Sequence, residues 1–152
     1  MKSADDDVLD LLDHAWARLN KRMDGLSDDE WAWRPIDTDA KVTIRWRLAH
    51  IAGFLSEPRN WAWLGSTARP RAKGISAHSA TEALGAAAAA YASFRASIST
   101  IGADLGSPIG PAAGQFADAT RRSFVLHIAD ELIHHGAEAA LIRDLYAASA
   151  CQ

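Results

Sequence analysis

Residues 120–150 read TRRSFVLHIADELIHHGAEAALIRDLYAASA. Apart from Gly136 this stretch contains neither glycine nor proline, and its length allows about eight turns of α-helix. On a helical projection of about 100° per residue, a set of apolar side chains shares one broad face. These are Phe124, Ile128, Leu132, Ile142 and Leu145. The stretch therefore predicts a long final helix that packs against other helices through this face.

Titratable side chains also fall on that apolar face, within about 100° of arc. They are His127, Glu131, His134, His135 and Glu138. An amphipathic helix normally keeps its polar residues on the opposite side. An isolated charge in a protein core is costly unless it is paired or ligates a metal. We therefore expect these side chains to point at the core, where they form either a metal site or a hydrogen-bond network.

The spacing of these residues limits which of them can share one ion. Glu131 and His135 stand four residues apart, so both can reach one ion at about 2.0–2.2 Å. His127 precedes Glu131 by four residues, but about 12 Å of helix separates it from His135, too far for one ion to take all three. At most two neighbouring members ligate together, and a third ligand must come from elsewhere. Two histidines and one carboxylate with an open position are typical of a catalytic metal site.

The whole chain has 152 residues, which is the size of one domain, so we expect a single domain over residues 1–152. With 49% hydrophobic and 23% charged residues it can bury a core. A net charge of −3 argues against nucleic-acid binding. No apolar run reaches the roughly 18 residues of a membrane span, and the start has no signal-peptide pattern. The single cysteine, Cys151, gives no disulfide framework and no cysteine-based metal site, so we expect a cytoplasmic protein.

Amphipathic segments precede the last helix at about residues 5–23, 43–56 and 79–101. Thr43 is a good N-cap for the second of them, and Pro58 must kink or end it. The chain shows no strand signal and no internal repeat. Four amphipathic segments of this kind predict an all-α fold, a four-helix bundle.

His50, in the second of these segments, is the best-placed candidate for the third ligand. No other histidine outside the last helix lies on so apolar a face, which it shares with Phe54. The alternative is a hydrogen-bonded core histidine, the usual role of a lone histidine on a mostly apolar helix. His14 lies near the edge of the first apolar stripe, and His78 lies in an exposed basic linker.

Two motifs, TIRWRLAHI at residues 43–51 and LHIADELIHHGAEAALIRDLY at residues 126–146, resemble the DinB-like metalloprotein superfamily. This superfamily includes the metal-binding domain of mycothiol-dependent maleylpyruvate isomerase and several thiol S-transferases, and the resemblance covers essentially the whole chain. It implies a DinB-like four-helix bundle. In the family, a divalent ion is bound by one histidine of the second helix and two residues four apart on the last helix.

Many members of the family carry His-x-x-x-His on the last helix, whereas this chain has Glu131 at the first of these positions and matches the His/Glu/His variant. The resemblance thus implies His50, Glu131 and His135 as the metal ligands, with zinc as the expected ion and nickel as the alternative. It gives no ligand role to the other polar residues of the arc. His134 and Glu138 could orient a ligand or bind substrate. His127 could shuttle protons, and ordinary hydrogen bonds are the alternative for all three.

The resemblance also implies a reaction. A low-molecular-weight thiol such as mycothiol would bind at the open metal position, where its pKa falls and the thiolate becomes the nucleophile. The substrate would be a small electrophile, and the leading hypothesis is a metal-dependent thiol S-transferase or isomerase. A metal-dependent hydrolase and a non-enzymatic, stress-related metal- or ligand-binding protein stay open. Family members often dimerise, and the six tryptophans are compatible with a homodimer interface.

Overall fold

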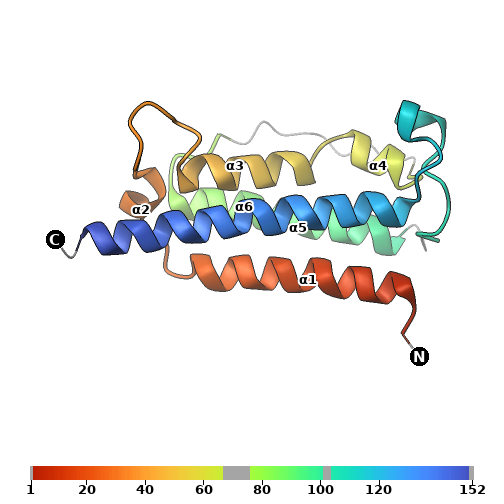
Figure 1. Cartoon of the computed structure of the whole chain (residues 1–152), viewed down its shortest axis with the longest axis horizontal. Coiled ribbons are helices and arrows are strands. Elements are labelled where there is room, and N and C mark those ends of the chain that lie inside the picture. Colours follow the sequence, from red (N-terminus) through yellow and green to blue (C-terminus); the bar gives the residue numbers. More distant parts are fainter. Residues whose placement is uncertain (1, 67–75, 101–103, 151–152) are drawn as a thin grey trace.

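The computed structural model describes residues 2–66, 76–100 and 104–150. Four long helices form one bundle (Figure 1): α1 (Ala4–Met23), α3 (Ile44–Leu55), α5 (Ala80–Thr100) and α6 (Arg121–Ser149). Short helices lie at the two ends of the bundle (Figure 1): α2 (Asp28–Ala32), α4 (Arg59–Trp63) and the 3-10 helix η1 (Pro111–Phe116). No β-strand occurs within these described ranges, so the predicted all-α four-helix bundle is confirmed.

Helix α6 lies between α1 and α3 in the bundle (Figure 1). It runs parallel to α1, since one ion pair joins the starts of the two helices and another joins their C-terminal parts. Asp5 contacts Arg122 at 2.6 Å, and Arg22 contacts Asp144 at 2.5 Å. Helix α3 runs the opposite way and packs against both α5 and α6 (Figure 1). The antiparallel pair α3 and α6 is the one that carries the predicted metal ligands.

Local sequence signals explain where α3 begins and ends. Thr43 caps its start, because its hydroxyl accepts a hydrogen bond from the backbone N–H of Trp46 at 3.0 Å. The helix ends at Leu55, three residues before Pro58, whose ring cannot continue it. The predicted end of the second segment is thus confirmed. Ile101, the predicted end of the third helix, and Cys151 lie outside the described residues.

The buried face of α6 differs from the predicted one. Leu145 was expected in the apolar stripe but is 46% exposed. Small and branched residues on the other side of the stripe are buried instead: Val125, Ala129 and Ala139. The face that packs is therefore rotated away from the polar arc.

This rotation also corrects the predicted orientation of the polar arc. Of its five residues only His135 is buried. Glu131 and Glu138 are half-buried at the edge of the core, and His127 and His134 are exposed. The titratable side chains thus line the border of the packed face rather than its centre, where water and small molecules can reach them. None of the described helices has the length and apolar character that crossing a membrane requires.

Candidate metal centre

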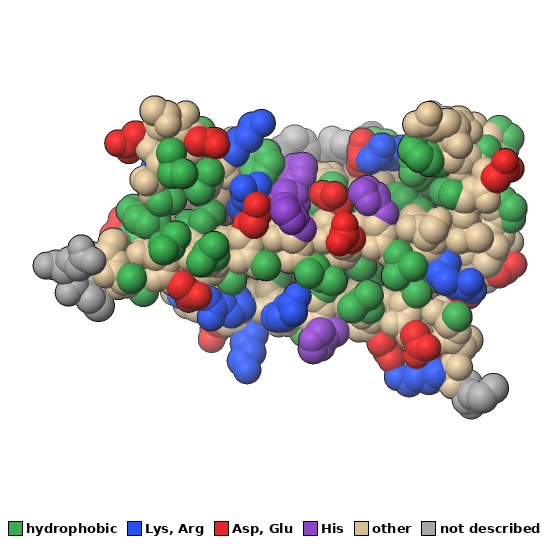
Figure 2. Space-filling view, viewed as in Figure 1, with side chains coloured by type: hydrophobic (Ala, Val, Ile, Leu, Met, Phe, Trp, Pro, Cys, Tyr) green, Lys and Arg blue, Asp and Glu red, His purple; other side chains and the backbone are tan. Residues whose placement is uncertain are grey.

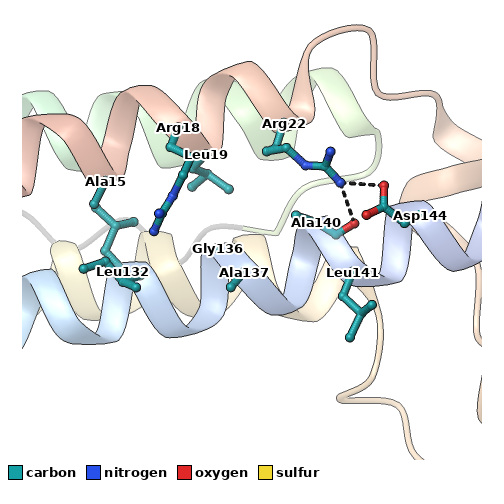
Figure 3. A pocket seen from close by; sticks show the side chains of 11 residues that line it. Ala15, Arg18, Leu19, Arg22, Leu132, Gly136, Ala137, Ala140, Leu141 and Asp144 are labelled. Carbon is teal, nitrogen blue, oxygen red and sulfur yellow. Dashed lines mark hydrogen bonds and ion pairs between the residues drawn. The ribbon is translucent and has the colours of Figure 1, made fainter.

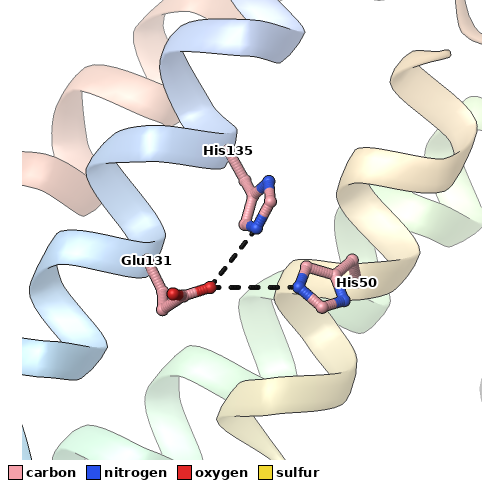
Figure 4. Close-up of side chains that lie close together, drawn as sticks. All are labelled: His50, Glu131 and His135. Atoms are coloured by element: carbon pink, nitrogen blue, oxygen red, sulfur yellow. Dashed lines mark ion pairs between the residues drawn. The ribbon is translucent and has the colours of Figure 1, made fainter. Parts of the chain in front are cut away.

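Histidine and acidic side chains gather on the face of the bundle where α3 and α6 lie side by side (Figure 2). His50 comes from the middle of α3, and Glu131 and His135 come from successive turns of α6 (Figure 4). A four-residue spacing places two side chains on the same edge of a helix, one above the other. Because α6 packs against α3 along this edge, the pair meets the histidine of the neighbouring helix.

The donor atoms of these three residues converge on one point (Figure 4). Glu131 Oε2 lies 3.3 Å from His135 Nε2 and 4.0 Å from His50 Nε2. One ligand atom from each residue lies within 4.8 Å of the other two. Donors that bind one zinc ion at about 2.0–2.2 Å in a tetrahedral arrangement are about 3.4 Å apart. Small rotations of the side chains are enough to bring all three onto one ion, with a fourth position left open.

The environment of His50 favours its neutral form. Burial lowers the pKa of His50 below its usual range, the neighbouring His135 adds to this, and Glu131 opposes it. A neutral imidazole keeps a lone pair for a metal, so this shift agrees with a ligand role. The side chain is still 38% exposed, which does not fit the alternative of a fully packed core histidine.

Glu138 lies behind His135 and contacts the ring nitrogen that faces away from the cluster. Glu138 Oε2 lies 2.9 Å from His135 Nδ1, the ring nitrogen that points away from the cluster. When Nδ1 donates its proton to this carboxylate, the lone pair of Nε2 is left facing Glu131 and His50. Metal-binding histidines almost always have such a partner on the second nitrogen. Glu138 is thus placed where the predicted orienting role requires it.

Arg47, which the sequence analysis did not single out, supports Glu138 from α3. Its Nε lies 3.0 Å from Glu138 Oε2 in an ion pair, and among the described residues this buried Nε has no hydrogen-bond acceptor. Its Nη1 lies 3.4 Å from His135 Nδ1 and cannot donate there when that nitrogen carries the proton. The side chain is only 14% exposed. Its position three residues before His50, on the same side of α3, is the signal that could have revealed it.

Aromatic rings hold the imidazole of His50 in place. Trp46 stacks on it with ring centroids 4.7 Å apart and planes at 14°, and Phe54 meets it edge-on at 5.7 Å. Each of them is four residues from His50 along α3, so both contacts follow from helical spacing. Phe54 was expected on this face, whereas no expectation was attached to Trp46.

The remaining polar residues of the arc lie around this centre. His134 is exposed, and its Nε2 lies 3.4 Å from Glu138 Oε1. Together with His135 these two residues form a second group of potential ligands whose atoms lie within 4.8 Å of one another. His127 lines a separate pocket at the start of α6. The other two histidines are exposed and belong to neither group: His14 and His78.

Among known protein families, the model of the DinB superfamily matches residues 11–139. Searches of curated proteins and of solved structures each found no match. The matched range covers most of the chain and includes all three residues of the cluster His50, Glu131 and His135.

Proposed function

The chain belongs to the DinB superfamily, a metal-binding superfamily, and from this premise we propose a metal-dependent, thiol-using enzyme that acts on small electrophiles. The observation that carries the proposal is the convergence of His50, Glu131 and His135 between α3 and α6, with Glu138 hydrogen-bonded behind His135. Three protein ligands that leave one position open are the arrangement of catalytic rather than structural zinc sites.

Zinc is the ion that this donor set suits, since two imidazoles and one carboxylate are common zinc ligands, and nickel is the alternative. A bound divalent ion supplies a Lewis acid that lowers the pKa of a thiol at its open position. The residues of the chain do the positioning. Glu138 orients the ring of His135, and the rings of Trp46 and Phe54 hold the imidazole of His50 in place.

The proposed reaction joins a low-molecular-weight, mycothiol-like thiol to an electrophilic carbon. The thiol loses its proton to solvent or to a base, its sulfur forms a bond to the carbon, and the leaving group departs with its bonding electrons. At an unsaturated acid or ketone the electron pair moves onto the carbonyl oxygen instead. Reversal after bond rotation then gives an isomer. His50 and Glu131 are only half-buried, so both a thiol and a substrate can approach the cluster.

The first test is the metal content of the purified protein, measured by elemental analysis. We expect near-stoichiometric zinc or nickel in the parent and its loss in His50→Ala, Glu131→Gln and His135→Ala. His134→Ala is the matched control, because it removes the adjacent, exposed histidine of the same helix. Retention of metal in His50→Ala with loss in His134→Ala would put the ion at the second group of ligands and contradict the proposal.

The second test is thiol conjugation. Metal-loaded protein is mixed with 1-chloro-2,4-dinitrobenzene and a series of thiols, including mycothiol, and product formation is followed by absorbance. We expect a rate above that of the His50→Ala variant with at least one thiol. Equal rates for parent and variant with every thiol would reject the transferase. Turnover of an ester that needs the metal but no thiol would favour a hydrolase instead.

A further inference from the structure

A pocket of about 270 Å³ opens beside the candidate metal centre, where α4, η1 and the start of α6 meet. Its volume is at the small end of ligand pockets in proteins. Aromatic side chains and a few polar side chains line it. The metal ligands take no part in it, so it is available for another molecule.

Trp63 of α4 forms the central wall of the pocket. Its ring centroid lies 5.1 Å from that of Phe124, at 66°, and 6.2 Å from that of Phe116, at 54°. Its Nε1 donates a hydrogen bond to the backbone oxygen of Ala112 at 3.3 Å, which fixes the indole. Phe124 is buried, whereas Phe116 is 51% exposed. An exposed ring at the rim of a fixed aromatic wall leaves apolar surface that a flat, apolar ligand would cover.

Few of the side chains that line the pocket carry a charge, and the charge of Arg59 is already shared with a carboxylate. The guanidinium of Arg59 lies 5.1 Å from the ring centroid of Trp63, and its Nε is 2.9 Å from Glu57 Oε2. His127 is the other residue with an ionisable side chain that lines the pocket. One cation that shares its charge with a carboxylate can meet a single anionic or polar substituent. The larger part of the recognition must therefore be apolar.

The pocket lies on the same side of α6 as the candidate metal centre. His127, in its wall, precedes Glu131 by one turn, which is about 6 Å along the helix axis. The larger groove of about 540 Å³ between α1 and α6 lies on the other side of this helix, where Gly136 faces Leu19 and Arg22 contacts Asp144 (Figure 3). Of these two spaces, only the pocket at α4 and η1 is next to the cluster.

We propose that this pocket binds the aromatic body of the electrophilic substrate, one ring or two fused rings in size, with its reactive carbon directed past His127 towards Glu131. The substrate class is thus aromatic rather than aliphatic. That the substrate is an electrophile rests on the proposed function. That the pocket binds an aromatic ring does not depend on it, because none of the candidate metal ligands lines the pocket.

The test uses 5-(dimethylamino)naphthalene-1-sulfonate, a fluorescent dye with two fused aromatic rings and one anionic group. Metal-free protein is titrated with it. We expect saturable binding in the parent and an affinity about 10-fold weaker in Phe116→Ala, the fold-change that the loss of one ring contact produces. Leu141→Ala is the control, because Leu141 is an equally exposed apolar residue in the groove between α1 and α6. Equal melting temperatures of both variants would show that the fold is intact.

Unchanged affinity in Phe116→Ala, loss of affinity in Leu141→Ala, or no saturable binding would each overturn the proposal. The variant His50→Ala separates it from the proposed function, because we expect it to lose metal and keep its affinity for the dye. Replacing zinc by paramagnetic cobalt then tests the position of the pocket. The proton signals of the bound dye should broaden in the cobalt-loaded parent, and sharp signals from bound dye would contradict the placement beside the cluster.

Discussion

At the scale of single residues, Glu138 is the residue that orients the imidazole ring of His135. Its Oε2 lies 2.9 Å from His135 Nδ1, and Arg47 Nε lies 3.0 Å from the same oxygen. When Nδ1 donates its proton to this carboxylate, the lone pair of Nε2 is left facing Glu131. The orientation of His135 towards the cluster His50, Glu131 and His135 thus depends on Glu138 and Arg47, which lie outside that cluster.

We expect Glu138→Gln to weaken zinc binding by about 10–100-fold, the usual effect of removing such a carboxylate partner. The amide can still fill the space, but it carries no charge and can present an N–H to His135. Affinity is measured by competition with a chromophoric chelator. His134→Ala serves as the control, since it removes the other histidine beside Glu138. An unchanged affinity in Glu138→Gln would show that the hydrogen bond does not orient the ligand.

At the scale of elements, α2 is joined to α6 by a partly buried ion pair. Arg143 Nε donates to Glu30 Oε1 at 2.8 Å, and the two side chains are 21% and 15% exposed. Arg143 also donates to the backbone oxygens of Arg22 at 2.7 Å and Asp24 at 2.8 Å. One arginine therefore ties the end of α1 and the short helix that follows it to the last helix of the bundle.

This ion pair makes stability depend on pH. The hydrogen bond from Arg143 is the main cause that lowers the pKa of Glu30, burial opposes it, and hydrogen bonds from Ser27 add to it. Because the pKa is lower in the folded state, the unfolded chain takes up a proton first as the pH falls below about 5. The stabilisation is complete above the pKa of the unfolded state and is lost as the pH falls through that of the folded state.

We expect Glu30→Gln to reduce the free energy of unfolding at pH 7 and to flatten its decline between about pH 5 and pH 3. Urea denaturation at a series of pH values measures both. Asp29→Asn is a suitable control, since Asp29 is an exposed carboxylate in the same helix. The same slope in Glu30→Gln as in the parent would mean that other carboxylates carry the acid sensitivity.

At the scale of the whole molecule, an ion held by His50, Glu131 and His135 would link α3 to α6 across the bundle. A ligand that binds only the folded state stabilises it by about 2.7 kcal/mol at 100 times its dissociation constant. For a chain of this length that corresponds to a rise in Tm of roughly 5–10 °C. EDTA should therefore lower the Tm of the metal-loaded parent by this amount and leave that of His50→Ala unchanged. Calorimetry measures it, and equal shifts in both proteins would exclude this site as the cause.

Sequence alone was enough for the four long helices of the bundle and for two of the three residues of the candidate site. Thr43 and Pro58 set the two ends of α3, because an N-cap hydrogen bond and the steric effect of a proline ring both act within a few residues. The pairing of Glu131 with His135 on one edge of α6 follows from the helical repeat alone. The ligand role of His50 was implied by the resemblance to a known family. The sequence pattern alone left a hydrogen-bonded core histidine as the alternative.

Only the tertiary structure decided which sides of these helices meet. It turned the packed face of α6 away from its polar arc, left Leu145 exposed, and brought Arg47 of α3 to Glu138 of α6. It also assembled the aromatic pocket from α4 and from η1 with the start of α6, two parts that lie far apart in the chain. Spacing along one helix fixes directions within that helix. The rotation of one helix against another depends on how all the side chains between them pack, and no local pattern in the sequence contains that information.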